Sequence, residues 1–109
     1  QVLALFLAGQ TLHRLDDYDE AMLKLSESIA LAEQVGEERM QGESIELLAI
    51  IQKQLGDLDR SLQLHERSSK LFEKNGYEAG LAGNYNNVGI VYKELGDYKK
   101  SLDFYKKFQ

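Results

Sequence analysis

Leu95-Gly96-Asp97-Tyr98 decides the fold of this 109-residue chain, because related stretches stand 40 and 80 positions before it. They are Leu55-Gly56-Asp57-Leu58 and Leu15-Asp16-Asp17-Tyr18. A period between about 20 and 50 residues is typical of solenoid proteins, whose units pack only on their neighbours. The period divides the chain into three units, over residues 1–40, 41–80 and, incomplete, 81–109.

Each of these stretches has the signals of a turn between two helices. Asp17, Asp57 and Asp97 stand where a carboxylate can accept the free amides at the start of a helix. In the third turn we also expect Gly96 to permit the bend and Tyr98 to pack beneath it. Apolar residues recur at helical spacing on both sides of each turn, which predicts a pair of amphipathic helices per unit.

The same signals predict six helices and most of their boundaries. First helices of the units are expected from Val2 to Leu15, from about Glu38 to Leu55 and from about Glu78 to Leu95, each followed by a second helix that begins after the capping aspartate. Gly36 and Gly76 stand where glycine can end the second helix in a left-handed conformation. We therefore expect an all-α solenoid of antiparallel helix pairs, about 2.7 repeats long.

The amino-acid composition and net charge argue against several classes of function. The sequence contains no cysteine, which excludes disulfides and thiolate metal sites and favours a reducing, cytoplasmic compartment. The net charge of −5 argues against nucleic acid as a partner, because duplex binding needs clustered lysine and arginine. The apolar run over residues 2–8 is too short to span a membrane and lacks the basic region of a secretory signal.

The motifs around the turns resemble those of the tetratricopeptide repeat family, and the resemblance covers the whole chain. In the third unit it rests on Tyr85, Val88-Gly89, Tyr92, Gly96-Asp97-Tyr98, Ser101 and Tyr105. The second unit matches at Ile45, Leu48-Ala49, Leu55-Gly56-Asp57-Leu58, Ser61 and His65, and the first at Leu5, Ala8-Gly9, Leu12, Asp17-Tyr18, Ala21 and Leu25. The usual repeat has 34 residues and ends with proline. The 40-residue period without proline is similar to a long-helix subgroup, and the resemblance implies a right-handed superhelix.

Small residues recur where the two helices of a unit should cross. They are Gly9, Ala49 and Gly89 on the first helices and Ala21, Ser61 and Ser101 on the second. Larger side chains there would push the helix axes apart. We expect Gly89→Leu to overpack the crossing and to lower the free energy of unfolding by about 1–3 kcal/mol or more. An unchanged melting temperature would argue against the pairing of these helices.

The resemblance implies a concave groove lined by the first helices. Its expected residues are Phe6, Leu7 and Gln10 in the first unit, Glu43, Glu46, Leu47 and Ile50 in the second, and Asn86, Asn87, Ile90 and Lys93 in the third. Asn86 and Asn87 are the strongest candidates, because an amide can bind a peptide backbone through donors and an acceptor. They could equally be ordinary polar surface residues. A carboxylate clamp would need basic residues where Phe6, Glu43 and Glu46 stand, so a basic or amphipathic helical segment is the expected partner.

The sequence lacks the motifs of nucleic-acid stacking, metal binding and catalysis. Most tyrosines occupy repeat packing positions and not a stacking platform for single-stranded nucleic acid. His13 and His65 are too far apart for a local metal motif, and His65 is expected to be a hydrogen-bonded core group. The sequence shows no nucleophile with a base and no phosphate loop. We therefore expect no enzyme activity, no cofactor and no metal.

Two hypotheses for the function follow. The first is a scaffold or adaptor module that binds a peptide or helical segment in the groove. The alternative is a regulatory or sensor segment that controls an output domain of a larger signalling protein. The chain begins with Gln1 and stops at Gln109 inside a helical pattern, so we expect a piece of a longer protein. Its uncapped ends, with Leu3, Phe6, Phe104 and Phe108, predict self-association.

Overall fold

A computed structural model describes residues 1–108 and contains six helices, in agreement with the sequence prediction. They are α1 (Val2–Arg14), α2 (Tyr18–Val35), α3 (Glu38–Gln54), α4 (Leu58–Lys74), α5 (Glu78–Glu94) and α6 (Tyr98–Phe108). The predicted helix ends agree with the observed ones to within one residue. No strand occurs in this described part of the chain.

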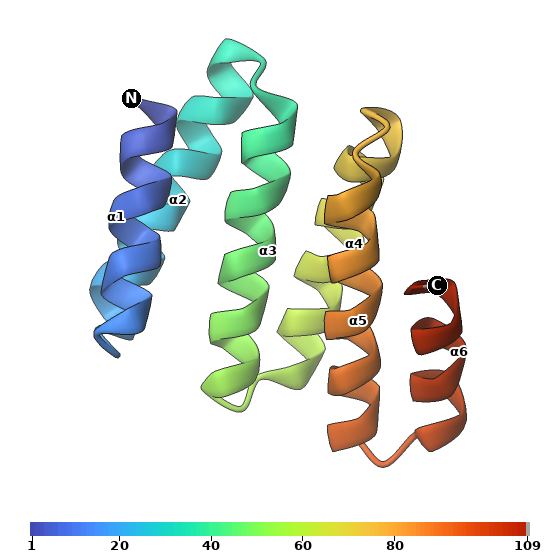
Figure 1. The fold of residues 1–109 in the computed structure, drawn as a ribbon. Helices are drawn as coiled ribbons and strands as arrows, with labels where there is room; N and C mark the ends of the chain where they lie inside the picture. Colours follow the sequence, from blue (N-terminus) through green and yellow to red (C-terminus); the bar gives the residue numbers. More distant parts are fainter. Residues whose placement is uncertain (109) are drawn as a thin grey trace.

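The helices form antiparallel pairs that stack into a solenoid. In Figure 1, α1, α3 and α5 stand side by side in the front row, with α2 and α4 behind them and α6 at the C-terminal end. Helix α3 contacts both α1 and α5, whereas α2 and α4 contact only the helices next to them in sequence. Since the first helices of the units approach one another and the second helices do not, the first helices form the inner face of the curve.

The three turns share one geometry. The carboxylates of Asp17, Asp57 and Asp97 each accept a hydrogen bond from the backbone amide three residues later, at 3.4, 3.0 and 3.2 Å. The predicted caps are thus confirmed. Gly96 has a φ of 83°, and Asp16 at the same repeat position has a φ of 61°. Aspartate is one of the few residue types other than glycine that enters this left-handed region, so the first unit keeps the turn without a glycine.

The predicted close crossings are also present. A Cβ atom on Gly89 would lie 2.7 Å from the ring of Tyr105, and one on Gly9 would lie 2.8 Å from Leu25. The crossing in the third unit is closed by Ser101, whose hydroxyl donates to the carbonyl of Gly89 at 2.7 Å. Because each glycine faces a ring or branched side chain, a larger residue must displace it.

The prediction that Tyr98 packs beneath its turn is wrong. Tyr98 is 68% exposed, whereas Tyr18 at the same position of the first unit is half-buried. The Tyr18 ring lies 5.9 Å from the ring of His13. Tyr18 also packs against a core that includes Ile45 and Leu48 of α3, whereas α6 contacts only α5 among the described helices. Tyr98 therefore has no further helix to pack on.

Candidate functional site: the inner groove

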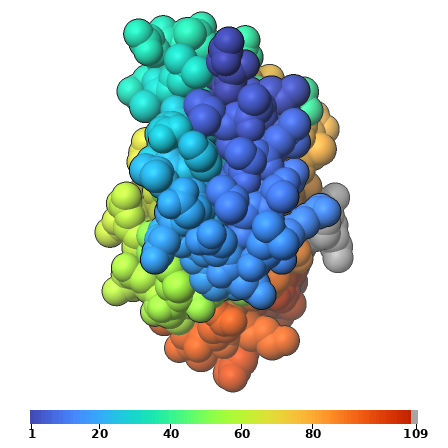
Figure 2. Space-filling model, turned by 90° about the vertical axis from the view of Figure 1, so that its left-hand side faces the viewer, coloured from blue at the N-terminus to red at the C-terminus, as the bar shows by residue number. Residues whose placement is uncertain are grey.

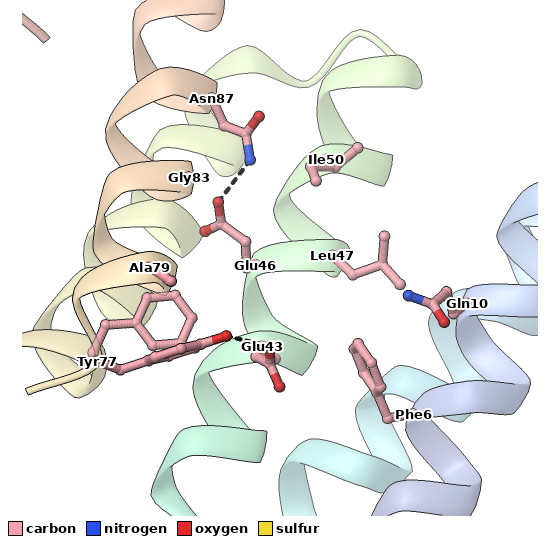
Figure 3. A pocket seen from close by; sticks show the side chains of 12 residues that line it. Phe6, Gln10, Glu43, Glu46, Leu47, Ile50, Tyr77, Ala79, Gly83 and Asn87 are labelled. Carbon is pink, nitrogen blue, oxygen red and sulfur yellow. Dashed lines mark hydrogen bonds between the residues drawn. The ribbon is translucent and has the colours of Figure 1, made fainter. Parts of the chain in front are cut away.

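The inner face carries a pocket of about 300 Å³ that is built by α1, α3 and α5. Figure 3 shows Phe6 and Gln10 of α1 facing Leu47, while Glu43 and Glu46 point to the other side. The residues that line the pocket are Phe6, Gln10, Glu43, Glu46, Leu47, Ile50, Phe72, Tyr77, Ala79, Gly80, Gly83 and Asn87. All three repeat units contribute to it, and the pocket has two halves of different chemistry.

The half between α1 and α3 is mainly apolar. Phe6 and Leu47 are partly buried and pack against the core cluster. That cluster consists of Ala21, Leu25, Ile45, Leu48, Ala49, Ile51 and Leu64. Ile50 adds a further apolar side chain, and Gln10 is the polar residue of this half. Since Phe6 and Leu47 rest on a buried core, this wall of the groove is held rigidly.

The half between α3 and α5 is organised by the carboxylate of Glu46. Its Oε1 accepts hydrogen bonds from Nδ1 of His65 at 2.9 Å, Oγ of Ser68 at 2.7 Å and Nδ2 of Asn84 at 2.8 Å. Its Oε2 accepts one from Nδ2 of Asn87 at 2.8 Å, which Figure 3 shows as a dashed line. One carboxylate therefore joins α3, α4 and α5. We call these five residues the Glu46 network.

The network keeps Glu46 ionised although little of it meets solvent. Its side chain is 14% exposed, and this burial alone would raise the pKa of the carboxyl. The hydrogen bond and electrostatic attraction of His65, with the hydrogen bonds of Asn87 and Ser68, together hold the pKa below its ordinary value. At neutral pH the groove thus contains a fixed negative charge.

Glu43 places a second carboxylate one helical turn before Glu46. Its Oε1 accepts a hydrogen bond from the hydroxyl of Tyr77 at 3.2 Å. The guanidinium of Arg39 lies 3.6 Å from the centre of the Tyr77 ring, in a cation–π contact that fixes this ring at the end of the pocket. Tyr77 comes from the turn before α5, so a turn residue closes one end of the groove.

The structure brings together most of the residues predicted for the groove. Those that line the pocket are Phe6, Gln10, Glu43, Glu46, Leu47, Ile50 and Asn87. Leu7, Asn86, Ile90 and Lys93 do not line it; Asn86 and Ile90 are half-buried, and Leu7 and Lys93 are exposed. Asn87 bonds to Glu46 within the protein, so one of its donors is already engaged. The prediction missed Phe72, Tyr77, Ala79, Gly80 and Gly83.

A four-residue spacing on α5 could have revealed part of the missed set. Ala79, Gly83 and Asn87 follow one another at this spacing and form the side of α5 that faces α3. The predicted set of Asn86, Ile90 and Lys93 lies on the neighbouring side of the same helix. Small residues at Ala79 and Gly83 leave the groove open there, which is a signal that a search for polar side chains overlooks.

His65 has the predicted role. It is 1% exposed and bonds to Glu46 through Nδ1, which confirms a buried, hydrogen-bonded core histidine. Within the described residues no group of three or more histidine, cysteine or acidic side chains is arranged to hold a metal ion. Of the six described helices, none is both long and apolar enough to cross a membrane.

The stacked helix pairs and the 40-residue period define the class of α-helical repeat solenoids. The chain belongs to the tetratricopeptide repeat family. Two family profiles described as tetratricopeptide repeat match it, one over residues 40–107 and the other over residues 2–34. Proteins of this family generally mediate protein–protein interaction and are typically non-enzymatic. A sequence search matched no curated protein.

Solved structures share the fold at low sequence identity. The TPR domain of Arabidopsis FLU superposes with a TM-score of 0.90 at 19% identity, covering 98% of this chain and 90% of that one. BtubC (BKLC) from P. vanneervenii gives a TM-score of 0.88 at 21% identity, again over 98% of this chain. This chain spans 44% of the length of BtubC. These similarities establish the solenoid fold.

Proposed function

We propose that the chain is a non-enzymatic scaffold or adaptor module that holds a peptide or helical segment of another protein in its inner groove, in the cytoplasm. The observation that carries this proposal is the single pocket to which all three units contribute side chains. A ligand lying across α1, α3 and α5 would contact each repeat, which makes the stack itself the binding element. The family's general role in protein interaction supports the proposal.

The chemistry of the groove supports an amphipathic or basic partner. Phe6, Leu47 and Ile50 offer apolar surface, while Glu43 and Glu46 offer negative charge. An acidic segment would be repelled by both carboxylates, and a purely apolar segment would leave them without a new partner. A segment that carries both apolar and basic side chains satisfies both halves of the pocket.

A groove-filling substitution provides the test. A Cβ atom on Gly83 would meet no other atom within 4 Å, so Gly83→Trp can fill the groove without a clash in the core. Ala30→Trp is the matched control, because Ala30 is exposed on α2 and does not line the pocket. Random 12-residue peptides are selected on the unmodified protein, and the dissociation constants of the selected peptides are measured by fluorescence anisotropy for all three proteins.

We expect Gly83→Trp to weaken binding at least about tenfold, with no change for Ala30→Trp. Unfolding midpoints of the variants show that the fold is kept. If the selected peptides bind Gly83→Trp as tightly as the unmodified protein, the groove is not the binding surface. If selection yields no binding peptide, the proposed function is wrong for peptides of this length.

The ends of the stack are the second part of the proposal, as surfaces for self-association. Figure 2 looks onto the first unit, with α1 and α2 in blue. Leu3 is 54% exposed there, and Leu102 is 53% exposed on α6 at the other end. Phe6 and Phe104 are half-buried and offer less surface than the sequence predicted, and the side chain of Phe108 lies outside the described part. Dimers in light scattering at high concentration, reduced by Leu3→Glu, would support this; monomers throughout would contradict it.

A further inference from the structure

We propose that the groove selects its partner by one cationic side chain, a lysine or arginine seated at Glu43 and Glu46, next to an apolar side chain seated on Phe6, Leu47 and Ile50. This inference rests on the proposed function and specifies the ligand of the same site. The partner is thus a segment in which a basic residue and an apolar residue point to the same side. Four observations carry the inference.

The first observation is the unequal use of the two Glu46 oxygens. Oε1 accepts three hydrogen bonds, from His65, Ser68 and Asn84, and is saturated. Oε2 accepts one, from Asn87, on the groove side of the carboxylate. A carboxylate oxygen has two lone pairs, so Oε2 keeps an acceptor site for an incoming donor. Oε2, which a ligand in the pocket would approach, therefore has room for one more hydrogen bond.

The second observation is the sign of the charge. Glu43 and Glu46 are the two ionisable carboxylates among the pocket-lining residues, and the lining set contains neither lysine nor arginine. Arg39 lies near this end of the groove, but its guanidinium is stacked on the ring of Tyr77. His65 forms an ion pair with Glu46 only when it is protonated, and it contacts Oε1. Glu43 and Oε2 of Glu46 therefore remain for a cation from outside, which would form charge-assisted hydrogen bonds with both carboxylates.

The third observation is the depth of Glu46. With 14% of its side chain exposed, Glu46 lies in a place where ionic strength screens a charge pair less than on an open surface. A neutral ligand would cover this carboxylate without replacing its lost hydration, which disfavours binding. A basic side chain reaches it well, because the methylene stem of lysine or arginine can lie on apolar surface while its charged end meets the carboxylate.

The fourth observation is the position of the apolar half on the other side of α3. Figure 3 shows Leu47 pointing to Phe6 and Gln10, and Glu46 pointing to Asn87, from neighbouring positions of one helix. The two halves are thus separated by the width of α3. Neighbouring helices pack at about 8–10 Å, whereas one helical turn rises about 5.4 Å, so the two anchor residues of the partner are about two turns apart if the partner is a helix. In an extended segment, residues two positions apart on one side are about 7 Å apart, and the length of the basic side chain covers the remaining distance.

His65 acts in this site as a positioning residue. It does not line the groove pocket, but its bond to Oε1 orients the carboxylate so that Oε2 is turned toward Asn87 and the pocket. Ser68 and Asn84 fix the same oxygen. A carboxylate held by three donors on one oxygen loses little conformational freedom when a ligand binds the other.

The experiment uses the selected 12-residue peptides as probes. Each tight-binding peptide is resynthesised with arginine replaced by citrulline, or lysine by norleucine, which removes the charge at nearly constant length. Affinities are measured for the unmodified protein, Glu46→Gln and Glu43→Gln. The control variant is Glu73→Gln, since Glu73 is exposed on α4 and does not line the groove pocket.

We expect the charge-free peptide to bind about tenfold more weakly than its parent to the unmodified protein and to Glu73→Gln. For Glu46→Gln the difference between the parent and the charge-free peptide should be clearly smaller, because the cation has lost one of its two carboxylates. If Glu46→Gln lowers stability too far, Glu43→Gln provides the same comparison. His65→Leu should weaken the parent peptide more than the charge-free one, a difference that loss of structure alone would not produce.

The outcomes separate this inference from the proposed function. Peptides that depend on the groove, as shown by Gly83→Trp, but bind equally well without their charge would overturn the cationic anchor and leave the groove function in place. Selected peptides without lysine or arginine would do the same. Absence of any groove-dependent peptide would overturn both. Charge-dependent binding that Glu73→Gln keeps and that Glu46→Gln and Glu43→Gln each reduce is the result that supports the inference.

Discussion

The two junctions between repeat units use the same positions for opposite chemistry. The first junction holds Phe6, Leu25, Ser28, Ser44 and Leu47. Forty residues later, the second junction holds Glu46, His65, Ser68, Asn84 and Asn87. Three apolar side chains of the first junction are thus replaced by a carboxylate, an imidazole and an amide, while the helices keep their arrangement.

The difference shows that the repeat fixes where side chains meet but not how they interact. In the first junction, Ser28 and Ser44 share a bond of 2.8 Å, and the Ser28 hydroxyl lies 3.5 Å from the carbonyl oxygen of Val2, among mainly apolar residues. In the second, the hydroxyl of Ser68 and the amide of Asn84 become donors to Glu46. The first junction is stabilised mainly by apolar burial, and the second by a polar network in which Nε2 of His65 is the buried side-chain atom that lacks a partner among the described residues. The groove lies across both junctions, so one of its halves is mainly apolar and the other is polar.

The largest expected effect comes from removing the centre of the polar junction. Glu46→Leu takes away the acceptor of four side chains and leaves buried donors, above all Nδ1 of His65, without a partner. We expect the free energy of unfolding to fall by about 3 kcal/mol, measured by urea denaturation. A loss below about 1 kcal/mol would show that the network contributes little to the junction.

The control for Glu46→Leu is a variant that carries apolar residues of the first junction at the second. Glu46→Phe, His65→Leu and Asn87→Leu together copy the residues that stand 40 positions earlier. Removing donors and acceptor at once leaves no orphaned charge, so the triple variant should recover most of the stability lost by Glu46→Leu. If it is no more stable than the single variant, the two junctions are not interchangeable and the comparison fails.

The reverse exchange should have a smaller but clear effect. Leu25→His places an imidazole at a fully buried position where Phe6, and not a carboxylate, occupies the partner's place. We expect a loss of about 2 kcal/mol from the burial of an unsatisfied polar ring. Leu23→His is the matched control, because Leu23 is 51% exposed on the same helix. Equal melting temperatures for both variants would argue against the apolar character of the first junction.

Acid should weaken the polar junction selectively. The pKa of Glu46 is lowered in the folded protein, so its contribution is complete above the ordinary value of 4.5 and is lost as the pH falls through the lowered value. Unfolding free energy measured from pH 6 to pH 3 should therefore fall less steeply in Glu46→Gln than in the unmodified protein. The Lys74 hydrogen bond also lowers the pKa of Glu38, so Glu38→Gln is the necessary comparison. Identical pH profiles for the unmodified protein and Glu46→Gln would contradict the stabilised carboxylate.

The smallest expected effect lies on the groove surface beside the polar junction. Gly83→Ala adds a methyl group that meets no atom within 4 Å and improves helix propensity, so it should raise stability by about 0.5–1 kcal/mol. Gly80→Ala is the contrast, because its Cβ would lie 2.5 Å from the Tyr77 ring. The melting temperature should rise in Gly83→Ala and fall in Gly80→Ala. Destabilisation by Gly83→Ala would mean that the groove is filled at this point.

The sequence could predict what local signals encode. Helix ends follow from aspartate caps and glycine stops, and the close crossing at Gly89 follows from a small residue at a repeated position. The groove positions on α1 and α3 could also be predicted, because a helical face is periodic. Tyr98 was misplaced because burial at this position depends on a further helix, such as α3 beside α2, and not on the turn itself.

The polar half of the site could be identified only from the structure. His65 bonds to a residue 19 positions away and Asn87 to one 41 positions away, and neither pairing has a local sequence signal. The side of α5 that faces α3 was also uncertain from sequence, since neighbouring sides of a helix differ by one position. Asn86 was predicted for the groove, whereas Gly83 on the neighbouring side of α5 lines the pocket.

Chemical-shift mapping of a selected peptide on the ¹⁵N-labelled protein tests the binding role of the groove most directly. We predict that the shifted backbone amides gather on the inner face, at Gln10, Leu47, Gly83 and Asn87, and that Ala30 on α2 does not shift. Gln10, Leu47 and Asn87 should stay unshifted when the peptide is added to Gly83→Trp. Shifts that gather on α2 and α4, with the inner face unchanged, would contradict the account.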